Sequence, residues 1–252
     1  MRRATQGNGP AALPFAIGAV LASIALLATA RADEPPARAD SSAAGARPDT
    51  GAAGARPDSL AKAASVPKRY PVEVISPPDS TLVDWLRKGN HVLLFRHAAT
   101  DWGQRDADVV SYTDRAAQRN LSAVGRAQAD SIGKAVKALG LSIGAVHSSP
   151  MFRCRDTAEI AFGRADTTSH LFTKSKESRA VRVAWLSQPI TDGSLLVLVS
   201  HQDPYIPLFR FQRDQLKEGD ALLIRPIGKD QWKLVAQIAP ADWTRLADRY
   251  GK

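Results

Sequence analysis

Three short apolar runs, each of the length of one β-strand, most constrain what this chain can fold into. They cover residues 91–95, 143–147 and 195–199. Between the first two lies a helix pattern: Ser122 can cap it, apolar residues recur at helical spacing, and Gly140 would end it. Strands that alternate with helices are typical of a parallel sheet covered on both faces. We therefore expect an α/β fold, a three-layer sandwich with a largely parallel central sheet.

Shorter patterns predict the remaining elements. Pro150 suits the first turn of a helix, and two apolar stretches near the end of the chain could form paired strands. We expect helices over residues 80–88, 150–161 and 179–186, and strands over residues 221–225 and 232–238.

The first 32 residues have the order of an export signal. Arg2 and Arg3 precede an uncharged stretch over residues 11–30, and Ala-Arg-Ala at residues 30–32 resembles a small-x-small cleavage site. We expect residues 1–32 to be a signal peptide, which predicts a periplasmic or extracellular location. The uncharged stretch also has the length of an uncleaved N-terminal membrane anchor, although its alanines make it weakly hydrophobic and favour cleavage.

Residues 33–68 differ in composition from the remainder of the chain. They consist mainly of Ala, Pro, Asp, Arg, Ser and Gly, and the heptapeptide Ala-Ala-Gly-Ala-Arg-Pro-Asp occurs twice, from residue 43 and from residue 52. Such a stretch cannot bury a core, and its prolines interrupt helices. We expect a disordered linker here and one folded domain over residues 69–252.

The charge of the chain limits its possible binding partners, and its cysteine content limits its possible disulfides. The formal net charge of +9 favours anionic partners, but no basic run interleaved with aromatic residues occurs, so no nucleic-acid partner is expected. Cys154 is the only cysteine, which excludes an intramolecular disulfide.

Polar and cationic residues follow each of the three apolar runs. The first run ends in Arg96-His97, the second leads to Arg153 in the next predicted helix, and the third ends in His201. The carboxyl ends of neighbouring parallel strands form the ligand site of open α/β sheets. Arginine binds phosphate oxygens bidentately, and a neutral imidazole can attack phosphorus. The pattern therefore predicts a phosphate pocket with a histidine nucleophile.

In such a pocket the cations themselves stabilise the transferring phosphoryl group, so no metal and no cofactor is expected. The histidines also lack the spacing of a zinc site. A carboxylic acid is wanted to protonate the leaving group.

Four segments resemble the motifs of one family. Phe-Arg-His-Ala-Ala-Thr-Asp-Trp (residues 95–102) resembles the signature of the histidine phosphatases, the phosphoglycerate-mutase-like superfamily, and residues 148–158 resemble its second motif. Residues 120–129 are similar to the helix between them, and residues 199–201 place a histidine where the family's second essential histidine falls. The resemblance spans roughly residues 88–226 and implies a phosphoglycerate-mutase-like fold.

The resemblance also implies roles for individual residues. His97 would be the nucleophile, Arg96 and Arg153 the phosphate ligands, and His201 a stabiliser of the transition state. Thr100 would bind the phosphate or support its loop.

The chain departs from the family pattern at several positions. Ala98 replaces a glycine, Gly103 replaces a phosphate-binding asparagine, and Gln202 stands where one branch has its acid. Other members place a glutamate some two dozen residues beyond the second arginine, which makes Glu177 the candidate leaving-group acid, with Asp203 as the alternative.

Together these features predict an exported, metal-independent phosphomonoesterase that works through phospho-His97. Its substrate would be a phosphorylated small molecule or an envelope component; the oligomeric state stays open. The alternative, favoured by Ala98 and Gly103, is a catalytically weak phosphate-binding or envelope-interaction protein on the same fold.

Overall fold

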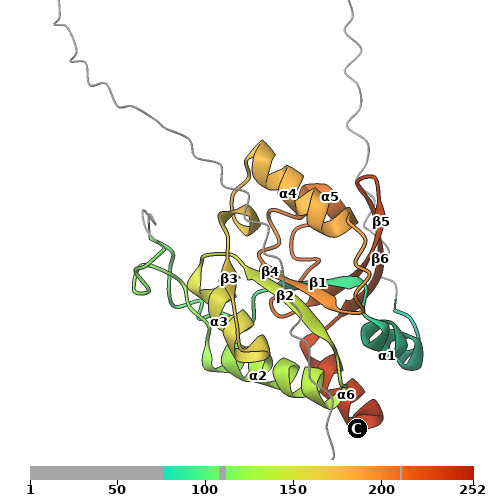
Figure 1. Cartoon of the computed structure of the whole chain (residues 1–252). Coiled ribbons are helices and arrows are strands. Elements are labelled where there is room, and N and C mark those ends of the chain that lie inside the picture. Colours follow the sequence, from blue (N-terminus) through green and yellow to red (C-terminus); the bar gives the residue numbers. More distant parts are fainter. Residues whose placement is uncertain (1–75, 108–111, 211) are drawn as a thin grey trace, which may run out of the picture. The chain divides into compact units, whose positions relative to one another are not determined.

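The computed structural model describes residues 76–107, 112–210 and 212–252 (Figure 1). The predicted signal peptide (residues 1–32) and linker (residues 33–68) lie outside these residues, so both remain predictions. Within the described part of the chain, no helix is both long and apolar enough to cross a bilayer.

One six-stranded sheet forms the middle of the domain, in the order β3-β2-β4-β1-β5-β6. Strands β3, β2, β4 and β1 are parallel to one another. Strand β5 is antiparallel to both of its neighbours, β1 and β6. The sheet is therefore largely parallel, as the sequence predicts. The strands are β1 (His91–Arg96), β2 (Ile143–Ser148), β3 (Asp166–Thr167), β4 (Leu195–Ser200), β5 (Ala221–Gly228) and β6 (Gln231–Ile238).

Helices cover both faces of the sheet and complete the three layers (Figure 1). One face carries α1 (Asp79–Lys88), α2 (Ala123–Ala138), α3 (Phe152–Phe162) and α6 (Pro240–Tyr250). The other carries the 3₁₀ turn η1 (Ser169–Leu171), α4 (Lys176–Ser187) and the short α5 (Ile206–Phe209).

The alternation of side chains along β1 shows how one strand serves two cores. Leu93 and Phe95 belong to the cluster with α1, α2, α3 and α6, whereas Val92 and Leu94 belong to the cluster with α4 and α5. Successive side chains of a strand point to opposite faces. A strand between two layers must therefore be apolar throughout, which explains the uninterrupted apolar runs in the sequence.

The N-terminus of α2 fixes the loop after β1. The Ser122 hydroxyl accepts a hydrogen bond from the Gly125 backbone N–H (3.1 Å), which confirms the predicted cap, and the Ser122 N–H donates to the Ala99 carbonyl (3.0 Å). A Cβ atom at Gly125 would lie 1.9 Å from the Ala99 oxygen. Only glycine allows this approach, so α2 and the loop after β1 form one rigid unit.

Two predicted helix starts are corrected. Helix α3 begins at Phe152, because Pro150 and the extended Met151 still belong to the loop. Helix α4 begins earlier than predicted, at Lys176, because the Ser175 hydroxyl caps it by accepting from the Ser178 N–H.

Helix α6 is the main element that the sequence patterns do not predict. Pro240 stands in its first turn, and Asp242 accepts a hydrogen bond from the Ala239 N–H (2.9 Å). Trp243 and Leu246 are fully buried against the sheet. Pro240 and Asp242 are typical of a helix start, and Trp243 and Leu246 are apolar residues at helical spacing. The exposed charged residues of this segment obscure the helical periodicity in the sequence.

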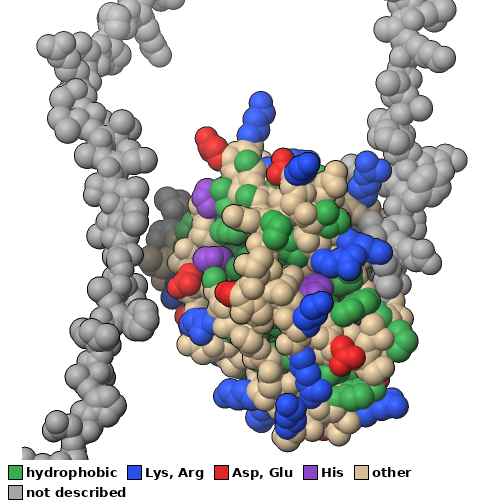
Figure 2. All heavy atoms as spheres, turned by 45° about the vertical axis from the view of Figure 1, so that its right-hand side comes forward, with side chains coloured by type: hydrophobic (Ala, Val, Ile, Leu, Met, Phe, Trp, Pro, Cys, Tyr) green, Lys and Arg blue, Asp and Glu red, His purple; other side chains and the backbone are tan. Residues whose placement is uncertain are grey.

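The face of the domain shown in Figure 2 carries charged side chains of both signs. On the face shown in Figure 2, Lys and Arg side chains occur in several places and acidic side chains stand among them.

Candidate active site

The three apolar strands end side by side, as predicted. Strand β4 lies between β1 and β2 and is parallel to both, with Arg96 opposite Ser200 and Ser148 opposite Val199. The His97 N–H donates to the Ser200 carbonyl (2.9 Å), which extends the ladder by one residue beyond β1. Residues that are distant in sequence thus meet at one edge of the sheet.

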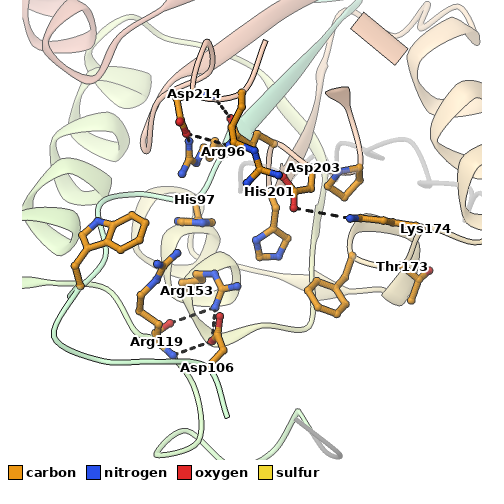
Figure 3. A pocket seen from close by; sticks show the side chains of 15 residues that line it. Arg96, His97, Asp106, Arg119, Arg153, Thr173, Lys174, His201, Asp203 and Asp214 are labelled. Atoms are coloured by element: carbon orange, nitrogen blue, oxygen red, sulfur yellow. Dashed lines mark hydrogen bonds and ion pairs between the residues drawn. The ribbon is translucent and has the colours of Figure 1, made fainter. Parts of the chain in front are cut away.

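A pocket of about 680 Å³ opens at this edge, and Figure 3 shows the side chains that line it. Four of the predicted site residues line it together: Arg96, His97, Arg153 and His201. The other lining residues are Trp102, Asp106, Arg119, Phe172, Thr173, Lys174, Gln202, Asp203, Pro204, Arg213 and Asp214.

His97 is held in one tautomer. Its Nδ1 lies 3.0 Å from the Ala98 carbonyl oxygen, and because a carbonyl can only accept, Nδ1 carries the proton. Burial, followed by the charge of Arg153, lowers the pKa of His97 well below its usual value. The ring is therefore neutral at pH 7, and its Nε2 keeps a free lone pair.

His201 lies beside His97, with ring centroids 5.3 Å apart. Its Nε2 is 2.9 Å from the Ser149 hydroxyl oxygen and 3.4 Å from the Cys154 sulfur. Burial, followed by the neighbouring His97, lowers the pKa of His201 well below its usual value. Two neutral imidazoles therefore share the floor of the pocket.

Cys154 packs under this floor and belongs to the core. Its side chain is fully buried among the residues of the sheet and α3. Burial raises the pKa of the thiol to about 12. A protonated, inaccessible thiol is not a nucleophile, so the Cys154 side chain serves packing.

Arg153 stands in the first turn of α3 and points into the pocket (Figure 3). Its Nη1 donates to the Asp106 Oδ1 (3.0 Å) and to the Arg119 carbonyl (3.3 Å). Its Nε is buried, and no described residue accepts a hydrogen bond from it. The free donor is available to a bound anion.

Arg96, the last residue of β1, is held by residues of the loop before β5. Its Nη1 donates to the Leu216 carbonyl (2.7 Å), and its Nη2 lies 3.6 Å from the Glu218 carboxylate. The guanidinium is thereby fixed in orientation before any ligand binds.

Arg119 is a third arginine of the pocket that the sequence analysis does not identify. It lies in the loop before α2, and its buried Nε, like that of Arg153, has no acceptor among the described residues. Burial, followed by the charge of Arg153, lowers its pKa. The residue directly precedes the helix motif over residues 120–129, but it follows no strand, so the strand-end rule could not find it.

Glu218 connects the arginines to the loop after β1. It accepts hydrogen bonds from both the N–H and the hydroxyl of Thr100 (2.9 Å each) and lies 3.8 Å from Arg119. Thr100 is therefore directed to Glu218 and is not among the residues that line the pocket. Of its two predicted roles, this contact corresponds to support of the loop.

Glu177 lies away from the pocket lining. It is exposed in the first turn of α4, where an acidic residue complements the helix dipole. Asp203, the alternative acid, lines the pocket and lies 3.9 Å from Lys174. Asp106 and Asp214 are two further carboxylates of the lining.

The alanine at the position of the family's glycine fits its surroundings. Ala98 is fully buried, and its N–H donates to the Thr157 hydroxyl (3.0 Å). Its φ is not among the positive values found in the described chain. An alanine costs nothing in backbone strain here.

Among the described residues, no group of three His, Cys, Asp or Glu side chains is arranged to hold a metal ion. The pocket lining contains four arginines, Arg96, Arg119, Arg153 and Arg213, and guanidinium groups bind phosphate oxygens bidentately.

Comparison with known proteins shows what the chain is similar to. No curated protein sequence matches the chain. Among solved structures, the protein histidine phosphatase SixA complexed with tungstate is similar, with 16% identity, a TM-score of 0.46, and coverage of 60% of this chain and 98% of that one. Phosphoserine phosphatase from Entamoeba histolytica in complex with 3-phosphoglyceric acid is also similar, with 14% identity, a TM-score of 0.37, and coverage of 53% and 89%.

The family model of the histidine phosphatase superfamily (branch 1) matches residues 92–180. This segment contains His97 and the pocket arginines Arg96, Arg119 and Arg153, while His201 and Arg213 lie beyond it. Residues 92–180 are therefore similar to the histidine phosphatase superfamily, in agreement with the motifs found in the sequence.

Proposed function

We propose that this chain is a phosphomonoesterase in which the Nε2 of His97 attacks the phosphorus of a bound phosphoester. The observation that carries the proposal is the state of His97: its ring is neutral, its Nδ1 proton is held by the Ala98 carbonyl (3.0 Å), and it lines a pocket together with four arginines. A nucleophile fixed in this way loses little entropy when it attacks.

In the first step the Nε2–P bond forms and the bond between phosphorus and the leaving oxygen breaks. The imidazole becomes a cation, which the Ala98 carbonyl stabilises through the Nδ1 proton. Arg96, Arg119 and Arg153 stabilise the equatorial phosphoryl oxygens, with His201 as a further donor. In the second step water attacks phosphorus, the Nε2–P bond breaks, and phosphate leaves with His97 restored.

The three guanidinium groups supply the positive charge that other phosphatases take from metal ions, and we propose that the reaction needs no metal. A chelator is the direct test. The full-length protein should hydrolyse p-nitrophenyl phosphate in EDTA, and added Mg²⁺ or Zn²⁺ should not raise the rate.

His97→Ala should abolish this turnover. His170→Ala is the matched control, because His170 contacts Ser178 (3.1 Å) outside the pocket and should be removable without loss of rate. Rapid acid-free quenching with labelled substrate should trap a phosphohistidine in the wild type and in His170→Ala only. Absence of both turnover and the labelled histidine in the wild type contradicts the proposal.

We also propose that the protein is exported, on the basis of the signal pattern in residues 1–32. N-terminal sequencing of the mature protein should start after residue 32. A mature chain that begins at Met1 or Arg2 contradicts cleavage.

A catalytically weak phosphate-binding protein is the second candidate. It is favoured by the Asp106 carboxylate, which already accepts a hydrogen bond from Arg153 Nη1 (3.0 Å). This function predicts that vanadate binds to the wild type but that no phosphoester turns over.

A further inference from the structure

Two aromatic rings line the pocket, and each lies against a residue of the proposed phosphate site. The Trp102 ring centroid is 3.9 Å from the guanidinium carbon of Arg119, and the Phe172 ring is 5.3 Å from that of His201. A group bonded to a phosphorus in this site would therefore have aromatic lining beside it.

Trp102 is unusual in its exposure. Its side chain is 69% exposed, although tryptophan is usually among the best covered residues of a protein. An exposed ring at the rim of a charged pocket is a ready contact surface for a ligand.

The backbone that carries each ring is held by local hydrogen bonds. The turn that carries Trp102 is closed by the Gln104 N–H to the Asp101 carbonyl (3.1 Å) and by the Gly103 N–H to the Asp101 carboxylate (2.9 Å). The Phe172 N–H donates to the Ser169 carbonyl (2.9 Å), and Tyr112 packs against the outer side of Phe172 with ring centroids 5.9 Å apart.

Three carboxylates of the described pocket lining form ion pairs with cations. Asp106, Asp203 and Asp214 have side chains that are 38%, 44% and 75% exposed, and each lies within 4.0 Å of an arginine or lysine. These carboxylates are therefore already engaged with cations of the pocket.

Asp220 is the described carboxyl group whose pKa is raised, and burial is the cause. It does not line the pocket, and its Oδ2 accepts from the Lys217 N–H (2.9 Å) and the Gln237 amide (2.8 Å). It is therefore not placed to reach a leaving oxygen.

A leaving group that receives no proton must be stable as an anion. A phenol has a pKa of about 10, whereas an alcohol resembles water and has a far higher pKa. Phenolate is thus the far better leaving group, and a phenyl ring also fits an aromatic wall. The ring contacts and the surroundings of the carboxylates point independently to the same chemistry.

We propose that the pocket selects phosphate monoesters of phenols, with the aromatic leaving group in contact with Trp102 and Phe172. This inference rests on the proposed phosphatase function and names the substrate class of the same site. A small aryl phosphate and a phosphotyrosine side chain share this chemistry.

Three substrates, tested with the full-length protein, separate the effect of an aromatic ring on kcat/KM from the effect of a stable leaving anion. Phenyl phosphate has both features, acetyl phosphate has a stable leaving anion without a ring, and glycerol 2-phosphate has neither. We expect kcat/KM to be highest for phenyl phosphate and at least about 100-fold lower for glycerol 2-phosphate. Equal rates on phenyl phosphate and glycerol 2-phosphate overturn the proposal. A phosphotyrosine peptide, compared with phenyl phosphate, then tells a protein substrate from a small one.

Variants test the rings themselves. Trp102→Ala and Phe172→Leu should lower the ratio of kcat/KM for phenyl phosphate to that for acetyl phosphate by about 3- to 10-fold, the size of one aromatic contact. Trp102→Phe is the conservative control and should restore most of the ratio. If both rates fall equally, the ring serves only to position Arg119, and the substrate class is wrong.

Binding gives a readout that does not need turnover. By calorimetry, phenylphosphonate should bind the wild type more tightly than methylphosphonate does, and Trp102→Ala should remove the difference. If no phosphoester is hydrolysed but this preference is present, the phosphatase function fails while the aromatic site stands. If hydrolysis occurs without any aryl preference in rate or binding, the aromatic site fails while the phosphatase function stands.

Discussion

The pocket has two halves that arise in different ways. The strand-end half consists of Arg96, His97 and His201, which directly end or follow buried parallel strands. The loop half consists of Trp102, Asp106 and Arg119, which lie between β1 and α2 and are partly or largely exposed. The first half inherits its geometry from the core, whereas the second depends on hydrogen bonds and ion pairs among loop residues. Rigidity therefore decreases from the nucleophile outwards.

The same division decides what the sequence can predict. Arg96, His97 and His201 are found because an apolar run reveals a strand, and parallel strands bring their carboxyl ends to one edge. Arg153 is found because its helix directly follows such a strand. No comparable rule places Arg119, since its approach to Arg153 and Glu218 depends on the path of a loop.

Replacement of Arg119 has the largest expected effect and tests whether the two halves of the pocket differ in function. If the loop half takes part in phosphoryl transfer, Arg119→Ala should lower kcat/KM for p-nitrophenyl phosphate by about 10²- to 10³-fold, the usual loss when one preorganised donor is removed. Arg153→Ala should have a similar effect. Steady-state kinetics on both variants measure it.

Arg126→Ala is the matched control for Arg119→Ala. Arg126 is 53% exposed on α2 and pairs with Asp156, which keeps a second partner in Arg115. Its removal should leave kcat/KM within about twofold. A wild-type rate in Arg119→Ala would confine catalysis to the strand-end half and to Arg153.

Glu218 links the two halves, and its removal should have the next largest effect. In Glu218→Gln the amide can still accept from Thr100, but the negative charge beside Arg96 (3.6 Å) and Arg119 (3.8 Å) is lost. We expect a loss of about 1–3 kcal/mol in the free energy of unfolding, measured in urea, and a rise in KM larger than any fall in kcat. An unchanged KM would show that the arginines are positioned without Glu218.

The pH dependence of stability tests the strand-end half. The pKa values of His97 and His201 are lowered in the folded state, mainly by burial. Between the folded and the unfolded pKa the unfolded chain binds more protons, so folding is favoured above the unfolded value of about 6.5 and weakened as the pH falls below it. The loss is at most about 1.4 kcal/mol per pH unit for each histidine.

Urea unfolding between pH 8 and pH 5 measures this slope. His201→Gln should remove part of it, because the buried ring no longer resists protonation. Since His97 stays neutral, kcat/KM should also remain level through pH 6.5. A fall in kcat/KM with a midpoint at or above pH 6.5, in the absence of a substrate pKa there, would contradict the neutral state assigned to the nucleophile.

Asp106→Asn should give the smallest effect, and its sign is opposite to the others. The Asp106 Oδ1 accepts from Arg153 Nη1 (3.0 Å) and from the backbone N–H of Arg119 (2.9 Å), so this carboxylate competes with phosphate for the Arg153 guanidinium. An asparagine keeps the neutral hydrogen bonds and removes the competing charge. We expect inorganic phosphate and vanadate to inhibit Asp106→Asn at concentrations about 3- to 10-fold lower than in the wild type, in keeping with the extra strength of charged hydrogen bonds. Weaker inhibition would instead mean that Asp106 holds Arg153 and Arg119 in the orientation that binds phosphate, in which case the loop half orders the strand-end half as well.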